Sequence, residues 1–381
     1  MIPYGRQDIT QADLDAVKDV LKSDFLTQGP QVPKFEKIVS EYCGANHAIA
    51  VNSATSALHI ACLSLGLKKG DYLWTSPISF VASANCGRYC GAEIDFVDID
   101  PKTYNMSLES LEAKLILAKE NNCLPKIIIP VHLGGQSCDM EYIHKLSEKY
   151  NFKIIEDASH AVGGKYLDKP VGSCEFSDIT VFSFHPVKII TTAEGGMALT
   201  NDSGLAESMF RLRTHGITKK SNDMKKKPDG EWYYEQLELG FNYRMNDIQA
   251  ALGISQFKRL DSIIARRHSV AERYDNLLKD LPITVPFLSS KSYSSFHLYV
   301  ILLQDQSKHR QTFKGMRDKG IGVNLHYIPI YRQPYHSHNK DEYKNFPNSE
   351  YYYSCAITIP LFPTISNEAQ DKVVDAIRQS L

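Results

Sequence analysis

Lys188 is the residue of this chain whose surroundings most favour reactive chemistry. It follows an apolar, β-branched run, and its neighbours in the sequence are Pro186, Val187, Ile189 and Ile190. An amine that is partly removed from water has a lowered pKa and becomes a nucleophile. A lysine that forms a Schiff base needs this property. The alternative for a lone lysine of this kind is an ordinary surface position after a strand.

Asp157 ends a second predicted strand, Lys153–Asp157, and His160 lies just beyond it. Catalysis by pyridoxal phosphate (PLP) needs a carboxylate beside the pyridine nitrogen, because the protonated ring accepts electrons from a carbanion. The alternative role for Asp157 is a helix N-cap, which is frequent for aspartate after a strand. A carboxylate and a lysine that both lie at strand ends favour the coenzyme interpretation.

A turn of small residues, Asn52–Ser56, follows the predicted strand Ala48–Val51, and the apolar pattern becomes helical from Ala57. A helix N-terminus after such a turn can bind a phosphate, because free N–H groups and the helix dipole favour an anion there. Thr55 and Ser56 add hydroxyl groups. Neither GxGxxG nor GxxxxGK[ST] occurs, so dinucleotide and P-loop sites lack support. A plain strand–helix turn with a serine cap is the alternative.

Phe80 lies in the turn after the strand end at Trp74, just before a predicted helix at Val81–Tyr89. Its ring would stack on one face of a pyridine ring. The alternative is a phenylalanine of the hydrophobic core.

Six motifs occur in one order along the chain: NSATSAL, TSPISF, IEDASHAVG, VFSFHPVK, TTAEGG and GFNYRMNDIQAALG. This order resembles the DegT/DnrJ/EryC1/StrS sugar aminotransferases, and the resemblance extends from the segment LTQGP to the segment HYIPIY. It implies an α/β fold of the fold-type I PLP-dependent transferases, similar to aspartate aminotransferase. A large domain with a mixed, mostly parallel sheet and a smaller C-terminal α+β domain are then expected.

The resemblance also implies roles for individual residues. Lys188 would bind the coenzyme covalently and be the catalytic residue. Asp157 would pair with the pyridine nitrogen, Phe80 would stack on the ring, and His160 would lie near the ring hydroxyl. The phosphate would be held by Thr55, Ser56 and Ser183. Asn242 would reach the phosphate in the other subunit of a homodimer, so the active sites would be shared. The substrate would contact Tyr4, Thr27, His326 and Tyr327. No metal is expected.

Within the family, three segments most resemble the transaminases of pseudaminic acid biosynthesis: NSATSAL, PISFVASAN and SFHPVK. The expected reaction moves the amino group of L-glutamate to C4 of UDP-2-acetamido-2,6-dideoxy-β-L-arabino-hexos-4-ulose. The products would be UDP-4-amino-4,6-dideoxy-N-acetyl-β-L-altrosamine and 2-oxoglutarate. The alternatives are a family member that uses a UDP-D-xylo, dTDP or GDP 4-keto sugar, and a non-catalytic scaffold with the same fold.

The elements that must position these residues alternate between strands and helices, which indicates a largely parallel sheet covered on both faces. In such sheets the site lies at the carboxyl ends of the strands. The capping box Thr10–Asp13 begins a helix, and a long helical pattern runs from Asn246 to Leu281. The remaining expected strands are Tyr72–Thr75, Ile94–Asp98, Lys126–His132, Ile179–Phe184 and Met197–Thr200.

The chain of 381 residues suggests two domains, residues 1–250 with the coenzyme and residues 251–381 with a bridging helix. The second is expected to contain strands at Phe296–Leu303, Val323–Tyr327 and Ala356–Pro360, and helices at His309–Lys319 and Asn367–Leu381. The loop Lys219–Gly230 has five lysines, and it is either a solvated loop or a lid that binds a diphosphate.

Composition excludes several other classes. The formal net charge of −1 argues against nucleic-acid binding. No apolar run approaches a membrane span and the N-terminus lacks a signal-peptide core, so we expect no membrane association. The eight cysteines form no CxxC pair, which fits reduced thiols in the cytoplasm. Cys86 and Cys90 could share a helix face, but the sequence shows no partners that would complete a zinc site.

Overall fold

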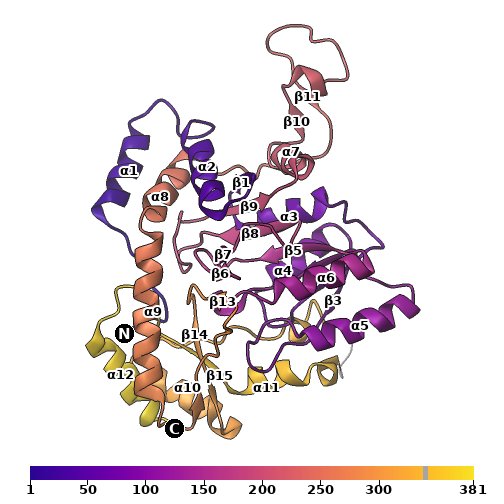
Figure 1. Cartoon of the computed structure of the whole chain (residues 1–381). Coiled ribbons are helices and arrows are strands. Elements are labelled where there is room, and N and C mark those ends of the chain that lie inside the picture. Colours follow the sequence, from indigo (N-terminus) through magenta and orange to yellow (C-terminus); the bar gives the residue numbers. More distant parts are fainter. Residues whose placement is uncertain (338–341) are drawn as a thin grey trace.

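The computed structural model describes residues 1–337 and 342–381 (Figure 1). Its central sheet has seven strands in the order β1-β9-β8-β5-β4-β2-β3. Strand β9 is antiparallel to both of its neighbours, and the other pairs are parallel. The strands are β1 (His47–Val51), β2 (Tyr72–Thr75), β3 (Glu93–Phe96), β4 (Ile127–Ile129), β5 (Lys153–Asp157), β8 (Ile179–Ser183) and β9 (Gly196–Thr200).

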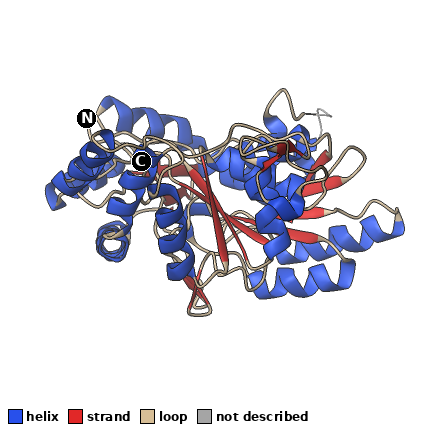
Figure 2. Ribbon diagram, turned by 90° about the horizontal axis from the view of Figure 1, so that it is seen from above, coloured by secondary structure: helices blue, strands red, loops and turns tan. Residues whose placement is uncertain are grey.

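Helices cover both faces of this sheet (Figure 2). The inner strands are therefore apolar on both faces, as in Ile127–Ile129, whose three side chains are fully buried. One face packs against α3 (Ala54–Ser64), α4 (Ala82–Tyr89) and α7 (Ser203–Leu212). The other face packs against α2 (Gln31–Cys43), α5 (Leu108–Glu120), α6 (Met140–Tyr150) and α8 (Asp247–Phe257).

A second hydrophobic core lies in the C-terminal part of the chain. Helix α9 (Leu260–Leu278) leads into it. The core contains the sheet β12-β14-β15 and three further helices. These elements are β12 (Ile283–Thr284), β14 (Tyr299–Leu303), β15 (Ala356–Ile359), α10 (His309–Asp318), α11 (Pro347–Cys355) and α12 (Asn367–Arg378). The predicted α/β architecture, with a large mixed sheet and a smaller α+β part, is confirmed.

The remaining elements are small. Helix α1 (Gln11–Leu21) begins at the predicted capping box, in which the Thr10 N–H donates to Asp13 at 2.8 Å. A three-stranded sheet has the order β13-β6-β7, with β6 (Lys165–Tyr166), β7 (Lys169–Pro170) and β13 (Ser292–Tyr293). Strands β10 (Ile217–Thr218) and β11 (Glu235–Gln236) form a hairpin that projects from the body of the molecule (Figure 1). We call residues 217–236 the arm. It contains the lysine-rich loop.

Two predicted elements differ from the structure. The helical pattern from Asn246 to Leu281 corresponds to two helices, because the backbone leaves helical geometry at Arg259. The guanidinium of Arg259 binds Asp8 at 2.6 Å and Asp13 at 2.9 Å. The predicted strand Val323–Tyr327 makes only an isolated bridge between Asn324 and Thr358, because the chain then turns away from β15. The predicted domain boundary at residue 250 falls inside α8 and stays a prediction.

Within the two described stretches, no helix combines the length and apolar character that crossing a membrane would require.

Candidate active site

Side chains from several strand ends meet at one edge of the large sheet. Asp157 ends β5, Ser183 ends β8, and Asn52 directly follows β1. Because these three strands run in the same direction, their carboxyl ends lie at the same edge. The predicted site residues on these strands are therefore brought together.

Lys188 lies in the loop between β8 and β9. The backbone N–H of Lys188 donates to the His185 carbonyl at 2.9 Å. The Phe184 carbonyl accepts from Thr191 Oγ1 at 3.0 Å and from the Thr192 backbone N–H at 2.9 Å. These hydrogen bonds fix the loop at both ends. The side chain is half-buried. Burial lowers the pKa of Lys188 to about 8, and the nearby Asp157 carboxylate acts in the opposite direction. A lowered pKa increases the fraction of the neutral amine, which is the form that can act as a nucleophile.

Asp157 is only 5% exposed, and its carboxylate accepts two hydrogen bonds. Ser83 Oγ donates to Oδ2 at 2.6 Å, and the Ser159 N–H donates to Oδ1 at 3.2 Å. Ser83 is itself paired with the Ser79 hydroxyl at 2.7 Å. Ser83 was not predicted from the sequence. Its only signal was the position of a small polar residue on the first turn of the helix that follows Phe80.

His160 is almost fully buried and has a defined tautomer. The Gly134 N–H donates to Nδ1 at 3.3 Å, so the ring proton lies on Nε2, which is 3.1 Å from the Tyr327 hydroxyl. Burial, with smaller effects from Lys188 and His326, holds the pKa of His160 well below its usual range. The ring is therefore neutral and can donate from Nε2 toward a group in the site.

The predicted substrate residues Tyr4, His326 and Tyr327 lie in the same region. The rings of Tyr4 and His326 are 5.3 Å apart, and Tyr327 lies 6.2 Å from Phe80. Burial, together with Lys188, lowers the pKa of His326 to about 3, and its Nδ1 is 2.9 Å from the Thr358 hydroxyl. Burial raises the pKa of Tyr327, with further contributions from Asp157 and Tyr4.

His297 is a further buried ring in this region and was not predicted from the sequence. Its ring centroid lies 4.3 Å from that of His160, and its Nδ1 is buried without a hydrogen-bond partner among the described residues. Burial is the largest cause of its lowered pKa, with smaller effects from His160 and Lys188. No sequence signal separated His297 from other histidines.

The predicted phosphate turn has the geometry of an anion site. Ser53 caps α3 by accepting the Ser56 N–H at 3.1 Å, and the N–H groups of Ala54 and Thr55 precede the first intrahelical hydrogen bond. Gly196 packs so closely on this turn that an added Cβ would lie 2.4 Å from the Ala54 nitrogen. Since Gly196 pairs with Ser183, the structure places the Ser183 strand end against the turn.

These residues fit the predicted coenzyme. A buried carboxylate, a lysine with a lowered pKa and an anion-binding helix end meet at one edge of the sheet. Phe80 is 58% exposed although it is a large aromatic residue, as a ring-stacking role requires. Beside His160, the buried His297 Nδ1 has no hydrogen-bond partner among the described residues and can bind a polar group.

Two predicted residues make no described contact with Lys188. The Asn242 carbonyl accepts from Asn52 Nδ2 at 3.4 Å, so Asn242 lies beside the phosphate turn of its own chain. Thr27 is exposed in the loop before α2, and Asp247 of α8 holds this loop by accepting the N–H groups of Gly29 (2.8 Å) and Gln31 (2.7 Å). No described contact joins Thr27 to Lys188.

A surface pocket of about 1050 Å³ lies elsewhere, between β1, α7 and the arm. It is lined by Lys219, Lys220 and Arg244, among others, but not by Lys188, Asp157 or His160. In residues 1–337 and 342–381, no group of three or more His, Cys, Asp or Glu side chains is arranged to hold a metal ion.

Comparison with known proteins gives one family. The profile of the DegT/DnrJ/EryC1/StrS aminotransferase family matches residues 7–378. The UDP-4-amino-4,6-dideoxy-N-acetyl-β-L-altrosamine transaminase of Campylobacter jejuni is 39% identical over 363 residues, which are 94% of this chain and 92% of that protein. The spore coat polysaccharide biosynthesis protein SpsC of Bacillus subtilis is 36% identical over 384 residues, 99% of this chain and 96% of that protein.

A solved structure agrees with these sequences. Helicobacter pylori PseC, an aminotransferase involved in the biosynthesis of pseudoaminic acid, superposes with a TM-score of 0.91. The two chains are 33% identical, and the match covers 100% of this chain and 98% of that chain.

Proposed function

The chain belongs to the DegT/DnrJ/EryC1/StrS aminotransferase family, and from this premise we propose that it transfers the amino group of L-glutamate to C4 of a UDP-linked 4-keto-6-deoxy-N-acetylhexosamine. That it is a sugar aminotransferase with PLP as its coenzyme follows from the family. The observation that carries the proposal is Lys188, an amine with a pKa of about 8, at the strand edge that also presents Asp157.

The coenzyme, when bound, supplies an electron sink that stabilises negative charge on the carbon from which a proton is removed. In our proposal, Asp157 faces the pyridine nitrogen and keeps it protonated, held in place by Ser83. The first turn of α3 with Thr55, Ser56 and Ser183 binds the phosphate. Phe80 stacks on the ring, and His160 donates from Nε2 toward the ring hydroxyl.

Lys188 has two tasks in this proposal. Its neutral amine would hold the coenzyme covalently, and the free amine would act as general base and acid that carries a proton between the substrate carbon and the coenzyme. A pKa of about 8 suits both tasks, because a general acid–base works best when its pKa lies near the working pH.

We propose UDP-2-acetamido-2,6-dideoxy-β-L-arabino-hexos-4-ulose as the substrate and UDP-4-amino-4,6-dideoxy-N-acetyl-β-L-altrosamine as the product. The Campylobacter relative and the Helicobacter structure support this choice. The Bacillus relative carries a different name at similar identity, so UDP-D-xylo, dTDP and GDP 4-keto sugars are the alternatives. Tyr4, His326 and Tyr327 would line the sugar pocket, with Thr27 and the loop Lys219–Lys227 as further contacts.

The test is a substrate panel. Purified enzyme with PLP and glutamate is assayed against both UDP-4-keto epimers and against dTDP and GDP 4-keto sugars. Product is identified by mass spectrometry and by NMR at C4. We expect the highest kcat/KM for the β-L-arabino sugar and no turnover by the Lys188→Ala variant. A preference for another sugar would refute the substrate, and full turnover by Lys188→Ala would refute the mechanism. Absence of both coenzyme binding and turnover in the native protein would favour the non-catalytic scaffold.

We also propose a cytoplasmic homodimer with shared active sites, in which Asn242 completes the phosphate site of its partner. Mixing Lys188→Ala with Asn242→Ala chains tests this arrangement. If Asn242 acts across the interface, each heterodimer contains one site without a lesion, and activity returns on mixing. If Asn242 acts in its own chain, beside Asn52, each site keeps one lesion and no activity returns.

A further inference from the structure

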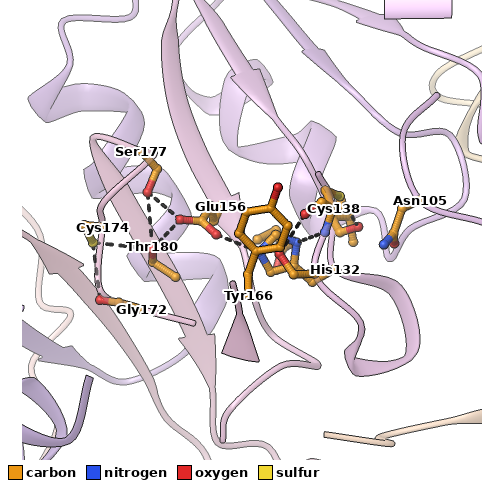
Figure 3. Close-up of polar contacts among 12 residues, drawn as sticks. Asn105, His132, Cys138, Glu156, Tyr166, Gly172, Cys174, Ser177 and Thr180 are labelled. Atoms are coloured by element: carbon orange, nitrogen blue, oxygen red, sulfur yellow. Dashed lines mark hydrogen bonds and ion pairs between the residues drawn. The ribbon is translucent and has the colours of Figure 1, made fainter. Parts of the chain in front are cut away.

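Glu156 is a buried carboxylate that the proposed chemistry does not use. It precedes Asp157 on β5, so the two side chains point to opposite faces of the sheet. Glu156 is 6% exposed, and its carboxylate accepts from Ser177 Oγ at 2.5 Å, from Thr180 Oγ1 at 3.0 Å and from His132 Nε2 at 2.7 Å (Figure 3). Burial opposes its charge, but these hydrogen bonds outweigh burial and lower the pKa of Glu156.

His132, the partner of Glu156, is completely buried. Burial disfavours protonation of this ring, whereas the Cys138 and Glu156 side chains favour it, and the net effect is a raised pKa. The Cys138 backbone N–H nevertheless donates to Nδ1 at 3.2 Å, which leaves no acceptor for a second ring proton. The hydrogen-bond geometry therefore assigns His132 as a neutral ring that donates from Nε2 to Glu156.

The backbone of His132 is tied to the active-site strand. Its N–H donates to the Asp157 carbonyl at 3.1 Å, and the Asp157 N–H donates to the Pro130 carbonyl at 2.9 Å. The side-chain bond to Glu156 and these backbone bonds hold the segment after β4 against the end of β5. The next turn starts at Leu133, whose N–H donates to Asn105 Oδ1 at 2.9 Å.

This turn ends at the active site. It contains Gly134, whose N–H donates to His160 Nδ1 and so fixes the proton of His160 on Nε2. The Gly134 carbonyl accepts the Leu298 N–H at 3.2 Å, so the turn is held from the other side as well. A continuous set of contacts therefore runs from Glu156 through His132 and Gly134 to His160.

We infer that His132 is a positioning residue for the active site, which sets the tautomer of His160 through the turn Leu133–Gly135. This inference rests on the proposed function, in which the Nε2–H of His160 faces the coenzyme. His132 itself touches neither coenzyme nor substrate. Its role is to hold a backbone N–H in place, as the supporting residues of a preorganised site do.

The tautomer of His160 can be measured in the apo protein. In a sample labelled with ¹⁵N in histidine, long-range ¹H–¹⁵N correlations report which ring nitrogen carries the proton, and His160→Gln assigns the signals. We expect two well-separated ¹⁵N shifts in the native protein. In His132→Phe, which keeps the ring volume but loses both hydrogen bonds, we expect the two shifts to converge as both tautomers become populated. His132→Gln keeps a donor for Glu156 and should restore the separation.

Two further variants separate positioning from general destabilisation. Leu111→Ala removes a buried side chain of α5 and lowers stability, but it should leave the His160 shifts unchanged. If His132→Phe does not fold, Asn105→Ala loosens the same turn at Leu133 and should give the same convergence. If the ¹⁵N chemical shifts of His160 are unchanged in folded His132→Phe or Asn105→Ala protein, the inference is overturned. Because the readout needs neither coenzyme nor sugar, a failed substrate assay would leave this result standing.

Discussion

The surroundings of Lys188 show how single residues set the chemistry of the site. Burial and the neighbouring amine lower the pKa of three nearby histidines, His160, His297 and His326. These rings therefore stay neutral at physiological pH and add no positive charge. The carboxylate of Asp157 opposes the fall in the pKa of Lys188.

The pKa of Lys188 predicts a pH dependence. In the apo protein, reductive methylation of Lys188 by formaldehyde and borane should follow a titration with its midpoint near pH 8. A lysine amine with the ordinary pKa of about 10.4 stays largely protonated at pH 8 and reacts appreciably only at higher pH. Site-resolved mass spectrometry of samples treated between pH 6 and 10 measures the rate at Lys188. A midpoint for Lys188 close to the ordinary lysine value would contradict the desolvation argument.

Replacing Asp157 should change this midpoint in a defined direction. The Asp157 carboxylate raises the pKa of Lys188, so Asp157→Asn should move the midpoint of methylation below pH 8. The same variant should lose most of its kcat with coenzyme still bound, because a neutral amide cannot hold the pyridine nitrogen protonated. An upward shift of the midpoint, or native kcat, would contradict the assigned role.

Ser83 gives a prediction for a residue that the sequence did not reveal. Ser83→Ala removes the hydroxyl that orients Asp157 Oδ2. One hydrogen bond to a charged group is worth about 1.5 kcal/mol, so coenzyme binding should weaken about tenfold. Ser64→Ala is the control, because its hydroxyl donates only to the Ala61 carbonyl at the end of α3. Equilibrium dialysis or coenzyme fluorescence gives both dissociation constants.

At the scale of elements, the sequence was sufficient to predict strands whose bounds are set by neighbouring residues. Strands β2 and β5 have the predicted bounds, because an apolar run between polar turns determines each of them. The break before α9 was missed. It falls at Arg259, which binds Asp8 and Asp13 far away in the sequence, and such contacts are not visible in a local pattern. Ser83 and His297 were missed because only the folded chain brings them to Asp157 and His160. The roles of the individual site residues stay predictions.

Helix α8 anchors the loop that carries Thr27, which gives a prediction at this scale. Asp247 is fully buried and accepts two backbone N–H groups from the loop. Asp247→Ala leaves both donors unpaired and should lower the free energy of unfolding by about 3 kcal/mol. Urea titration measures this loss, and hydrogen exchange should accelerate at Gly29 and Gln31. The control Asp261→Ala removes an exposed carboxylate that binds Tyr42, and it should cost less than about 1 kcal/mol.

At the scale of the whole molecule, the candidate site combines three distant parts of the chain. Tyr4 comes from the N-terminal segment, Asp157 and Lys188 from the large sheet, and His326 from the C-terminal part. Ile2 forms a bridge with Ile321, which fixes the N-terminal segment beside His326. The site therefore depends on the relative placement of both cores, and a change in the N-terminal segment can alter the proposed sugar pocket.

The arm offers a reporter of the proposed dimer. The chain has two tryptophans, Trp74, which is 2% exposed, and Trp232 of the arm, which is 77% exposed in the single chain. In a Trp74→Phe variant all tryptophan emission comes from Trp232. If the arm packs on a partner, this emission should be blue-shifted at micromolar concentration and move to the red on dilution. Emission of a fully hydrated indole at all concentrations, with a monomer in sedimentation, would refute an interface at the arm.

The antiparallel strand β9 has a consequence for synthesis on the ribosome. Strand β1 pairs with β9, and its last residue, Val51, also forms a bridge with Arg244. Both β9 and Arg244 are translated long after β1. A nascent chain that ends before Gly196 therefore holds β1 and the phosphate turn without their partner strand. The rest of the sheet, from β2 to β8, can pair earlier. Pulse proteolysis of stalled chains should show β1 becoming protected only after residues 196–200 have left the exit tunnel.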